Sequence, residues 1–231
     1  MGAPEVFDCE QRSADWYALR AGIPTASQFA AVLANGRSGG ESKTRRTYML
    51  KLAGEILTGE PMDNYSNVHM ERGRVMEAEA RDFYAFMTDA EPNLVGFIRN
   101  GDKGASPDAL LGDDGLLEIK SALPHLLIDM LIKDKSPAEH WAQVQGQLWV
   151  SEREWCDLVV YWPHLPLFVR RIPRDEDYIK QLSEGVDRFN AELAEVVDKI
   201  QQYGGQVASD ISKPEARPPE TVDMSEQPPV F

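Results

Sequence analysis

The sequence predicts an α/β fold in which a central mixed β-sheet is flanked by helices. Helical patterns come first along the chain, followed by a strand hairpin, further helices, a second pair of strands and a last long helix. All these patterns lie in one chain of 231 residues, of which 42% are hydrophobic. This length is enough for one domain of ordinary size with a substantial core.

The N-terminal third contains helical patterns that glycine and proline interrupt. Thr25-Ala26-Ser27-Gln28 has the spacing of a capping box, which predicts that Thr25 begins a helix and caps it. The Gly/Ser-rich stretch from Asn35 to Ser42 is expected to be a mobile loop, and it carries Arg37. The helices predicted here are Asp15–Arg20, a segment from Thr25, Thr44–Thr58 and His69–Met87.

Strand patterns follow. Apolar residues on both sides of the polar turn Gly112-Asp113-Asp114-Gly115 predict a β-hairpin. A second strand pair is expected around Pro163-His164-Leu165-Pro166. The predicted strands are Leu94–Arg99, Ala105–Leu111, Gly115–Lys120, Asp157–Trp162 and Leu167–Ile172. The remaining predicted helices are Leu123–Lys133, Pro137–Val150 and Asp175–Tyr203.

The composition changes after the glycine pair Gly204-Gly205. Prolines and scattered acidic residues follow, with few apolar side chains to bury. We therefore predict a single domain over residues 1–204 and a disordered, acidic, proline-rich tail over residues 205–231.

Charge and composition limit the classes of function. The chain has 24 basic and 38 acidic residues, a net charge of −14, which argues against a protein that coats nucleic acid through bulk charge. An enzyme with a local basic groove is still compatible with this balance. Apolar runs are too short to cross a bilayer, and no signal peptide is recognisable. Two distant cysteines suit a reducing cytoplasm, and isolated histidines argue against zinc.

One acidic motif indicates chemistry. Asp108 follows Ser106-Pro107, and Glu118 precedes Lys120 by two positions, which places both on the same face of a strand. The predicted hairpin brings Asp108 back toward this pair. Two carboxylates and an ammonium suit phosphodiester cleavage assisted by Mg²⁺, with Mn²⁺ as a substitute. The plainer alternative is a Pro-Asp turn beside a solvated strand face.

Five motifs together resemble a known family. In order and spacing they match the phage lambda exonuclease, or YqaJ-type viral recombinase, family of the PD-(D/E)xK nuclease superfamily. The resemblance covers about residues 10–200 and rests on Trp16–Ser27, Glu71–Glu77, Ser106–Asp108, Glu118–Lys120 and Ala142–Gln145.

The resemblance implies a restriction-endonuclease-like core and a Mg²⁺-dependent exonuclease. Such an enzyme degrades one strand of linear double-stranded DNA, 5′ to 3′, from a 5′-phosphorylated end during phage-type recombination. It also implies a homotrimeric ring, a single-strand annealing protein as partner, and the cytoplasm of a bacterial host. The alternatives are a structure-specific or sequence-specific endonuclease on the same core, and a recombination scaffold with little activity.

The same resemblance assigns roles at the acidic motif. Asp108 and Glu118 are expected to be metal ligands together with the main-chain carbonyl of Ile119. Lys120 is expected to orient or activate the attacking water.

Two further residues receive supporting roles from the family. Glu77 is expected to support a second metal ion or its waters, although it could instead be a solvated residue paired with Arg74 or Arg81. Gln143 is expected to position the lysine and the nucleophile. Its neighbours Gln145 and Gln147 are assigned to packing or DNA contact.

The resemblance also places a 5′-phosphate site in the N-terminal segment. Arg20, Thr25, Ser27 and Ser106 match the family's phosphate-binding positions. Hydroxyl groups and a guanidinium are suitable groups for binding an anion, which agrees with this assignment. Arg37, on the Gly/Ser-rich loop, matches a DNA-contacting arginine.

Overall fold

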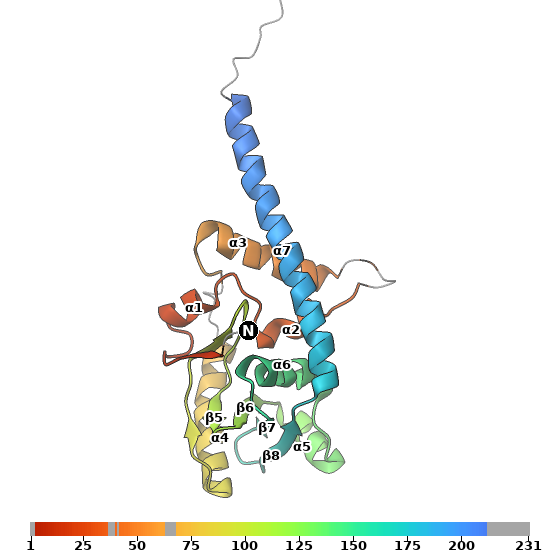
Figure 1. Cartoon of the computed structure of the whole chain (residues 1–231). Helices are drawn as coiled ribbons and strands as arrows, with labels where there is room; N and C mark the ends of the chain where they lie inside the picture. Colours follow the sequence, from red (N-terminus) through yellow and green to blue (C-terminus); the bar gives the residue numbers. More distant parts are fainter. Residues whose placement is uncertain (1–2, 37–39, 41, 63–67, 212–231) are drawn as a thin grey trace, which may run out of the picture. The chain divides into compact units, whose positions relative to one another are not determined.

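Two β-sheets form the framework of the computed structural model, which describes residues 3–36, 40, 42–62 and 68–211 (Figure 1). The larger sheet has the strand order β2-β5-β6-β7-β8, and the smaller has the order β1-β3-β4. The chain divides into two compact units, Met1–Val197 and Asp198–Phe231, and both sheets belong to the first. Within the described ranges, no helix has both the length and the apolar character needed to cross a membrane.

The five-stranded sheet confirms the predicted mixed α/β architecture. Its central strand β6 (Gly115–Ser121) pairs antiparallel with β5 (Ala109–Leu111) and parallel with β7 (Trp155–Tyr161). At the two edges, β2 (Pro92–Asn93) pairs with β5 and β8 (Phe168–Pro173) pairs with β7, both antiparallel. The first five residues of β6 are all buried, as expected for a strand that helices cover on both faces.

Helix α4 (Val68–Thr88) covers one face of this sheet. Because side chains alternate along a strand, Leu117 and Ile119 point the same way. They form one buried cluster with Ala80 and Tyr84 of α4.

Helix α6 (Trp141–Ser151) covers the opposite face. Its residues Val144 and Leu148 are fully buried in a cluster with Leu116 of β6. Glu118 has the same parity as Leu116 along the strand, so its side chain also points toward α6. This places a buried carboxylate between the sheet and a helix.

The smaller sheet was not expected from the sequence. It consists of β1 (Glu5–Phe7), β3 (Phe97–Asn100) and β4 (Lys103–Ala105), all antiparallel. The prediction of one strand over Ala105–Leu111 is wrong, because Ser106-Pro107-Asp108 separates β4 from β5 and the two strands lie in different sheets. Proline has no N–H to donate to a sheet and is suited to such a break.

The helix predicted from Thr25 is short and interrupted, whereas the helices predicted before and after it are present within one residue of their predicted bounds. Thr25 begins a single 3-10 turn followed by one turn of α-helix, and its side chain makes no capping hydrogen bond, so the capping-box prediction is wrong. The hydroxyl is engaged with Arg20 and Ser27 instead. The elements are α1 (Ala14–Arg20), η1 (Ala26–Gln28), α2 (Phe29–Val32), α3 (Lys43–Thr58), α5 (Pro124–Lys133), η3 (Ala138–His140) and α7 (Glu176–Ile211).

Helix α7 continues through Gly204 and Gly205, where the sequence predicts its end. Each glycine costs a helix about 1 kcal/mol relative to alanine, a penalty that an otherwise favourable helix can absorb. The predicted boundary between residues 204 and 205 therefore falls inside α7. Residues 212–231, the greater part of the predicted tail, lie outside the described residues.

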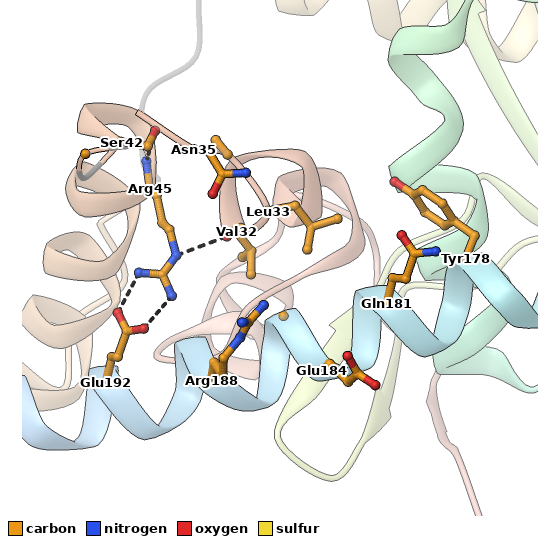
Figure 2. Close-up of a pocket in the computed structure, with 13 residues that line it drawn as sticks. Val32, Leu33, Asn35, Ser42, Arg45, Tyr178, Gln181, Glu184, Arg188 and Glu192 are labelled. Atoms are coloured by element: carbon orange, nitrogen blue, oxygen red, sulfur yellow. Dashed lines mark hydrogen bonds and ion pairs between the residues drawn. The ribbon is translucent and has the colours of Figure 1, made fainter. Parts of the chain in front are cut away.

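A cavity of about 570 Å³ lies between α2, the start of α3 and the first half of α7 (Figure 2). Arg45 closes one side, because its guanidinium donates to both carboxylate oxygens of Glu192 at 2.5 and 3.0 Å. Its Nε also donates to the Val32 carbonyl at 3.1 Å. The predicted site residues that the structure describes do not line this cavity.

Candidate active site

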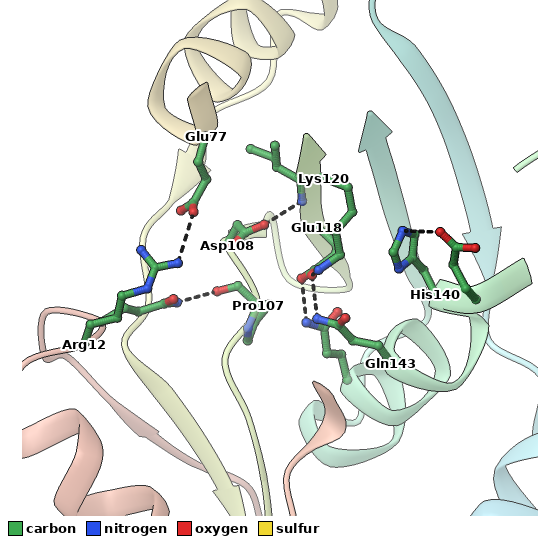
Figure 3. A network of polar contacts seen from close by, with 12 residues as sticks. Arg12, Glu77, Pro107, Asp108, Glu118, Lys120, His140 and Gln143 are labelled. Carbon is green, nitrogen blue, oxygen red and sulfur yellow. Dashed lines mark hydrogen bonds and ion pairs between the residues drawn. The ribbon is translucent and has the colours of Figure 1, made fainter. Parts of the chain in front are cut away.

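The hairpin of β5 and β6 brings the two predicted carboxylates together. The backbone N–H of Asp108 donates to the Leu117 carbonyl at 3.1 Å, and Ala109 pairs with Leu117, so Asp108 lies opposite Glu118. Residues paired across antiparallel strands project to the same face. The Asp108 carboxylate also accepts the backbone N–H of Ile119 at 2.5 Å, which fixes its position (Figure 3).

Glu118 is only 2% exposed, and three donors contact its carboxylate. Its Oε1 accepts from Nε2 of Gln143 at 2.6 Å and lies 2.5 Å from Nζ of Lys120. Its Oε2 accepts from Nε2 of Gln147, also at 2.6 Å. The two glutamines are four residues apart on α6 and therefore face the same way. A buried charge with this many partners has a fixed orientation.

Lys120 is a cation at neutral pH in this arrangement. Burial by itself lowers the pKa of its ammonium, but the carboxylates of Glu118, Asp108 and Glu77 outweigh burial and raise the pKa above the ordinary lysine value. A positively charged amine can orient a nucleophile or neutralise developing charge, whereas it cannot accept a proton. These carboxylates therefore keep Lys120 protonated while no metal ion is bound, which suits the orienting role.

The acidic side chains repel one another. Burial, and then the carboxylates of Glu118 and Glu77, raise the pKa of Asp108 well above its ordinary value. Burial also raises the pKa of Glu77, where the nearby Arg12 guanidinium opposes the shift. Full ionisation of these three carboxyl groups is therefore unfavourable, and Lys120 alone does not compensate for it.

This donor set fits a hard divalent cation. Among the described residues, no group of three or more His, Cys, Asp or Glu side chains is placed to share a metal ion. A cation here would take its protein ligands from the carboxylates of Asp108 and Glu118 and the carbonyl of Ile119, with waters in addition. Oxygen-only ligation that leaves room for waters is characteristic of Mg²⁺, and Mn²⁺ accepts the same ligands.

Glu77 comes from α4 and approaches from the other side of Asp108. Among the described side chains its ion-pair partner is Arg12, with 3.9 Å between Nη2 and Oε2. Of the two predicted partners, Arg81 contributes only a longer-range charge interaction, and the side chain of Arg74 lies outside the described residues. The structure therefore places Glu77 beside the acidic pair, and its predicted role toward a second metal ion stays a prediction.

The four predicted phosphate-binding residues also come together. The Arg20 guanidinium donates to Ser106 Oγ at 3.4 Å and to Thr25 Oγ1 at 3.3 Å, and Thr25 Oγ1 lies 3.5 Å from Ser27 Oγ. Arg20 stacks on the ring of Trp16, 4.0 Å from its centroid. A stacked guanidinium beside three hydroxyl groups is well suited to bind a phosphate.

Both groups of residues line one cavity of about 180 Å³. The lining includes Asp108, Glu118, Lys120 and Gln143 together with Arg20, Thr25, Ser27 and Ser106. Glu77 lines two neighbouring cavities and not this one. Arg37, the predicted DNA contact, lies outside the described residues.

Sequence reasoning missed three residues of this site. Gln147, assigned to packing or DNA contact, instead contacts Glu118; its spacing of four from Gln143 was the available signal. Gln145, in contrast, is a packing residue outside the site. Its side-chain N–H donates to the Pro173 carbonyl, and its side-chain oxygen accepts from the Asp175 N–H. Trp16 received no role at the site from the sequence, yet its indole N–H donates to Ser106 Oγ at 2.9 Å. No sequence signal identified Arg12.

Comparison with known proteins gives one family. The model of the YqaJ-like viral recombinase domain matches residues 15–154. No curated protein matches the chain.

The chain is also similar to solved structures of exonucleases. The chain resembles an alkaline exonuclease from Laribacter hongkongensis, LHK-Exo, alone and in complex with dAMP, with 33% sequence identity and a TM-score of 0.76. The match covers 84% of this chain and 100% of that one. A phage-related exonuclease from Haemophilus somnus shares the fold, with a TM-score of 0.60 at 14% identity over 80% of this chain and 99% of the other.

Proposed function

The chain belongs to the YqaJ-like viral recombinase domain family, which makes it a nuclease of phage-type recombination, and on this premise we propose a specific activity for it. The proposed activity is that of a Mg²⁺-dependent exonuclease. It degrades one strand of linear double-stranded DNA in the 5′-to-3′ direction, starting from a 5′-phosphorylated end.

The observation that carries this proposal is the shared cavity. A nuclease that cuts internally needs the acidic pair and the lysine, but it has no need of a separate anion site beside them. Here Arg20 and Ser106 line the same cavity as Asp108 and Lys120. A terminal phosphate bound at Arg20 would place the first internal phosphodiester toward the acidic pair, and so define both the end and the direction of digestion.

The metal requirement rests on the ligands available. Asp108, Glu118 and the carbonyl of Ile119 would hold the ion, and Gln143 and Gln147 would keep Glu118 in position for it. The chemistry that Mg²⁺ supplies when bound is acidification of a water and stabilisation of charge on the scissile phosphate. Lys120, as a cation, would orient the nucleophilic water and share in neutralising that charge.

The oligomeric state and the protein partner are proposed from the family resemblance alone. We include in the proposal that the chain forms a homotrimeric ring and works beside a single-strand annealing protein. Size-exclusion chromatography with light scattering tests the first, and co-purification with an annealing protein encoded in the same phage or prophage tests the second.

The deciding experiment compares DNA ends. Linear duplexes with 5′-phosphate or 5′-hydroxyl ends, and closed circles, are incubated with the protein in Mg²⁺, in Mn²⁺ and in EDTA. We expect digestion only with a divalent ion, fastest from 5′-phosphorylated ends, releasing nucleotides from one strand. Cutting of closed circles would identify an endonuclease, and absence of cleavage in every metal would favour a scaffold role.

We expect the Arg20→Ala variant to lose its preference for 5′-phosphorylated ends. Removing the guanidinium removes a charge-assisted contact, each of which contributes about 1.5–3 kcal/mol, or about tenfold to hundredfold in rate. Digestion rates of phosphorylated and hydroxyl ends, measured on the same duplex, should become similar. If the variant still prefers phosphorylated ends as strongly as the unsubstituted protein, Arg20 is not the phosphate ligand.

A further inference from the structure

Arg12 has a backbone conformation that its residue type does not favour. Its φ is +70°, in the left-handed region where glycine is the natural choice. The other described non-glycine residues with positive φ are Asp89, Asp134, Glu152 and His164, none of which lines the candidate active-site cavity. Strained backbone conformations at a functional site indicate that the side chain is needed where the backbone puts it.

The neighbouring residue anchors the segment that carries Arg12. The side-chain amide of Gln11 donates to the Val95 carbonyl at 2.9 Å and to the Pro107 carbonyl at 3.0 Å. Pro107 immediately precedes Asp108, so the segment carrying Arg12 is tied directly to the strand end that carries the acidic pair. Figure 3 shows the Arg12 side chain extending from this segment toward Glu77, with Asp108 beside it.

The Arg12 guanidinium is only loosely engaged. Among the described residues its ion-pair partner is Glu77, and their 3.9 Å separation is too long for a hydrogen bond. Both side chains are partly exposed, at 33% and 25%. An exposed pair of this kind holds its members weakly. The five N–H donors of the guanidinium are therefore available to a stronger acceptor.

The position of Arg12 also points to such an acceptor. Arg12 lines the shared cavity that contains Arg20 and Lys120, and it lines two adjoining cavities of about 230 and 220 Å³. The cavity of about 220 Å³ includes Lys120 and Ser121, and the one of about 230 Å³ includes Asp108. Arg12 lines all three cavities, so a DNA strand that extends from the shared cavity into either neighbour would pass the guanidinium.

We propose that Arg12 binds an internal phosphodiester of the DNA strand at the acidic pair, exchanging the Glu77 carboxylate for the phosphate. This inference rests on the proposed function, because it requires DNA in the cavity. It assigns two different phosphates to two arginines: the terminal phosphate to Arg20 and an internal phosphodiester to Arg12. The planar guanidinium can donate two parallel hydrogen bonds to a phosphate, which the lone contact with Glu77 does not provide.

The test uses Arg12→Gly, because glycine adopts a φ of +70° without strain and the variant should fold at least as well. His164→Gly is the matched control, since it relieves a similar φ of +65° in the exposed β7–β8 turn, away from the site. Duplex affinity of the full chain is measured in EDTA over a series of salt concentrations, with 5′-phosphate and 5′-hydroxyl ends. No cleavage is needed for this measurement.

We expect Arg12→Gly to bind duplex about tenfold more weakly, equally for both kinds of end, with the slope of log affinity against log salt reduced by about one. His164→Gly should match the unsubstituted protein in affinity and slope. Affinity within twofold of the unsubstituted protein and an unchanged slope would overturn the proposal. A loss confined to phosphorylated ends would also overturn it, because Arg12 would then belong to the terminal site.

A second arm separates phosphate binding from simple neutralisation of Glu77. If Arg12 only balances that carboxylate, the double variant Arg12→Gly/Glu77→Gln should recover the lost affinity. We expect no recovery, and full recovery would contradict the proposal. If the unsubstituted protein does not bind duplex at all, the proposed function is overturned together with this inference. If the unsubstituted protein binds duplex and Arg12→Gly binds it equally well, only this inference is overturned.

Discussion

The Asp108→Asn variant should lose DNA cleavage and yet unfold at a higher temperature than the unsubstituted protein when metal is absent. Burial and the neighbouring Glu118 and Glu77 carboxylates raise the pKa of Asp108, which means that its ionised form is unfavourable in the folded protein. Asparagine removes that charge and keeps an oxygen that accepts the Ile119 N–H. We expect a gain of about 1 kcal/mol, or about 3 °C in a domain of this size.

The pH dependence of stability follows with a definite sign. An aspartate whose folded-state pKa is raised stabilises the folded protein below its unfolded value of about 3.9, and this contribution is lost as pH rises through the folded pKa. In EDTA, the melting temperature of the unsubstituted protein should therefore fall as pH is raised from about 4 toward neutrality, more steeply than that of Asp108→Asn. Parallel pH profiles for the two proteins would contradict this account.

Cleavage and metal binding give the complementary result. Loss of a metal ligand removes several kcal/mol of charge stabilisation, so the cleavage rate of Asp108→Asn should fall by about a thousandfold or more. Millimolar Mg²⁺ should raise the melting temperature of the unsubstituted protein and leave that of the variant unchanged. An equal Mg²⁺ response in both proteins would show that Asp108 is not a ligand.

We expect Glu118→Gln to abolish cleavage as well, but to lower stability. Glu118 is buried and accepts hydrogen bonds from Gln143 and Gln147 while it pairs with Lys120. A neutral amide would leave the Lys120 ammonium without its closest counter-charge and would direct N–H groups toward a donor. Breaking a buried ion pair costs about 3–5 kcal/mol. Because the lysine is 26% exposed, we expect the free energy of unfolding to fall by about 3 kcal/mol.

The matched control is Glu192→Gln. Glu192 also accepts two hydrogen bonds from a cationic side chain, Arg45, but it is 48% exposed. Exposed pairs contribute about 1 kcal/mol or less, so this variant should cleave DNA normally and lose little stability in urea denaturation. Equal destabilisation by the two substitutions would mean that the burial of Glu118 is not what makes its interactions strong.

Local patterns were sufficient to predict the acidic centre. The turn from Gly112 to Gly115 joins two apolar strands, and a tight hairpin fixes which residues face each other. Asp108, Glu118 and Lys120 therefore converge for reasons that lie within thirteen consecutive residues. The mixed sheet was predictable too, because its main strands are long enough to show an apolar pattern.

Features that depend on distant segments were not predictable. Strand β1 has three residues and carries no periodicity that distinguishes it from a loop. The division of Ala105–Leu111 between two sheets depends on which partner strands lie beside each half. Thr25 has the spacing of a cap, but its hydroxyl is taken by Arg20, a tertiary contact that local sequence does not encode. The position of Arg12 likewise follows from contacts of Gln11 with Val95 and Pro107, which are distant in the sequence.

The break between β4 and β5 has a mechanical consequence. Ser106, at the phosphate pocket, and Asp108, at the acidic pair, are separated by one proline, so their Cα atoms are at most about 7 Å apart. Because Pro107 restricts its own backbone and that of Ser106, this short link holds the two groups of residues at a nearly constant distance. If the function proposed for this chain is correct, a DNA end bound beside Ser106 would lie at the same distance from the acidic pair in every cycle, and each cycle would release a product of the same size.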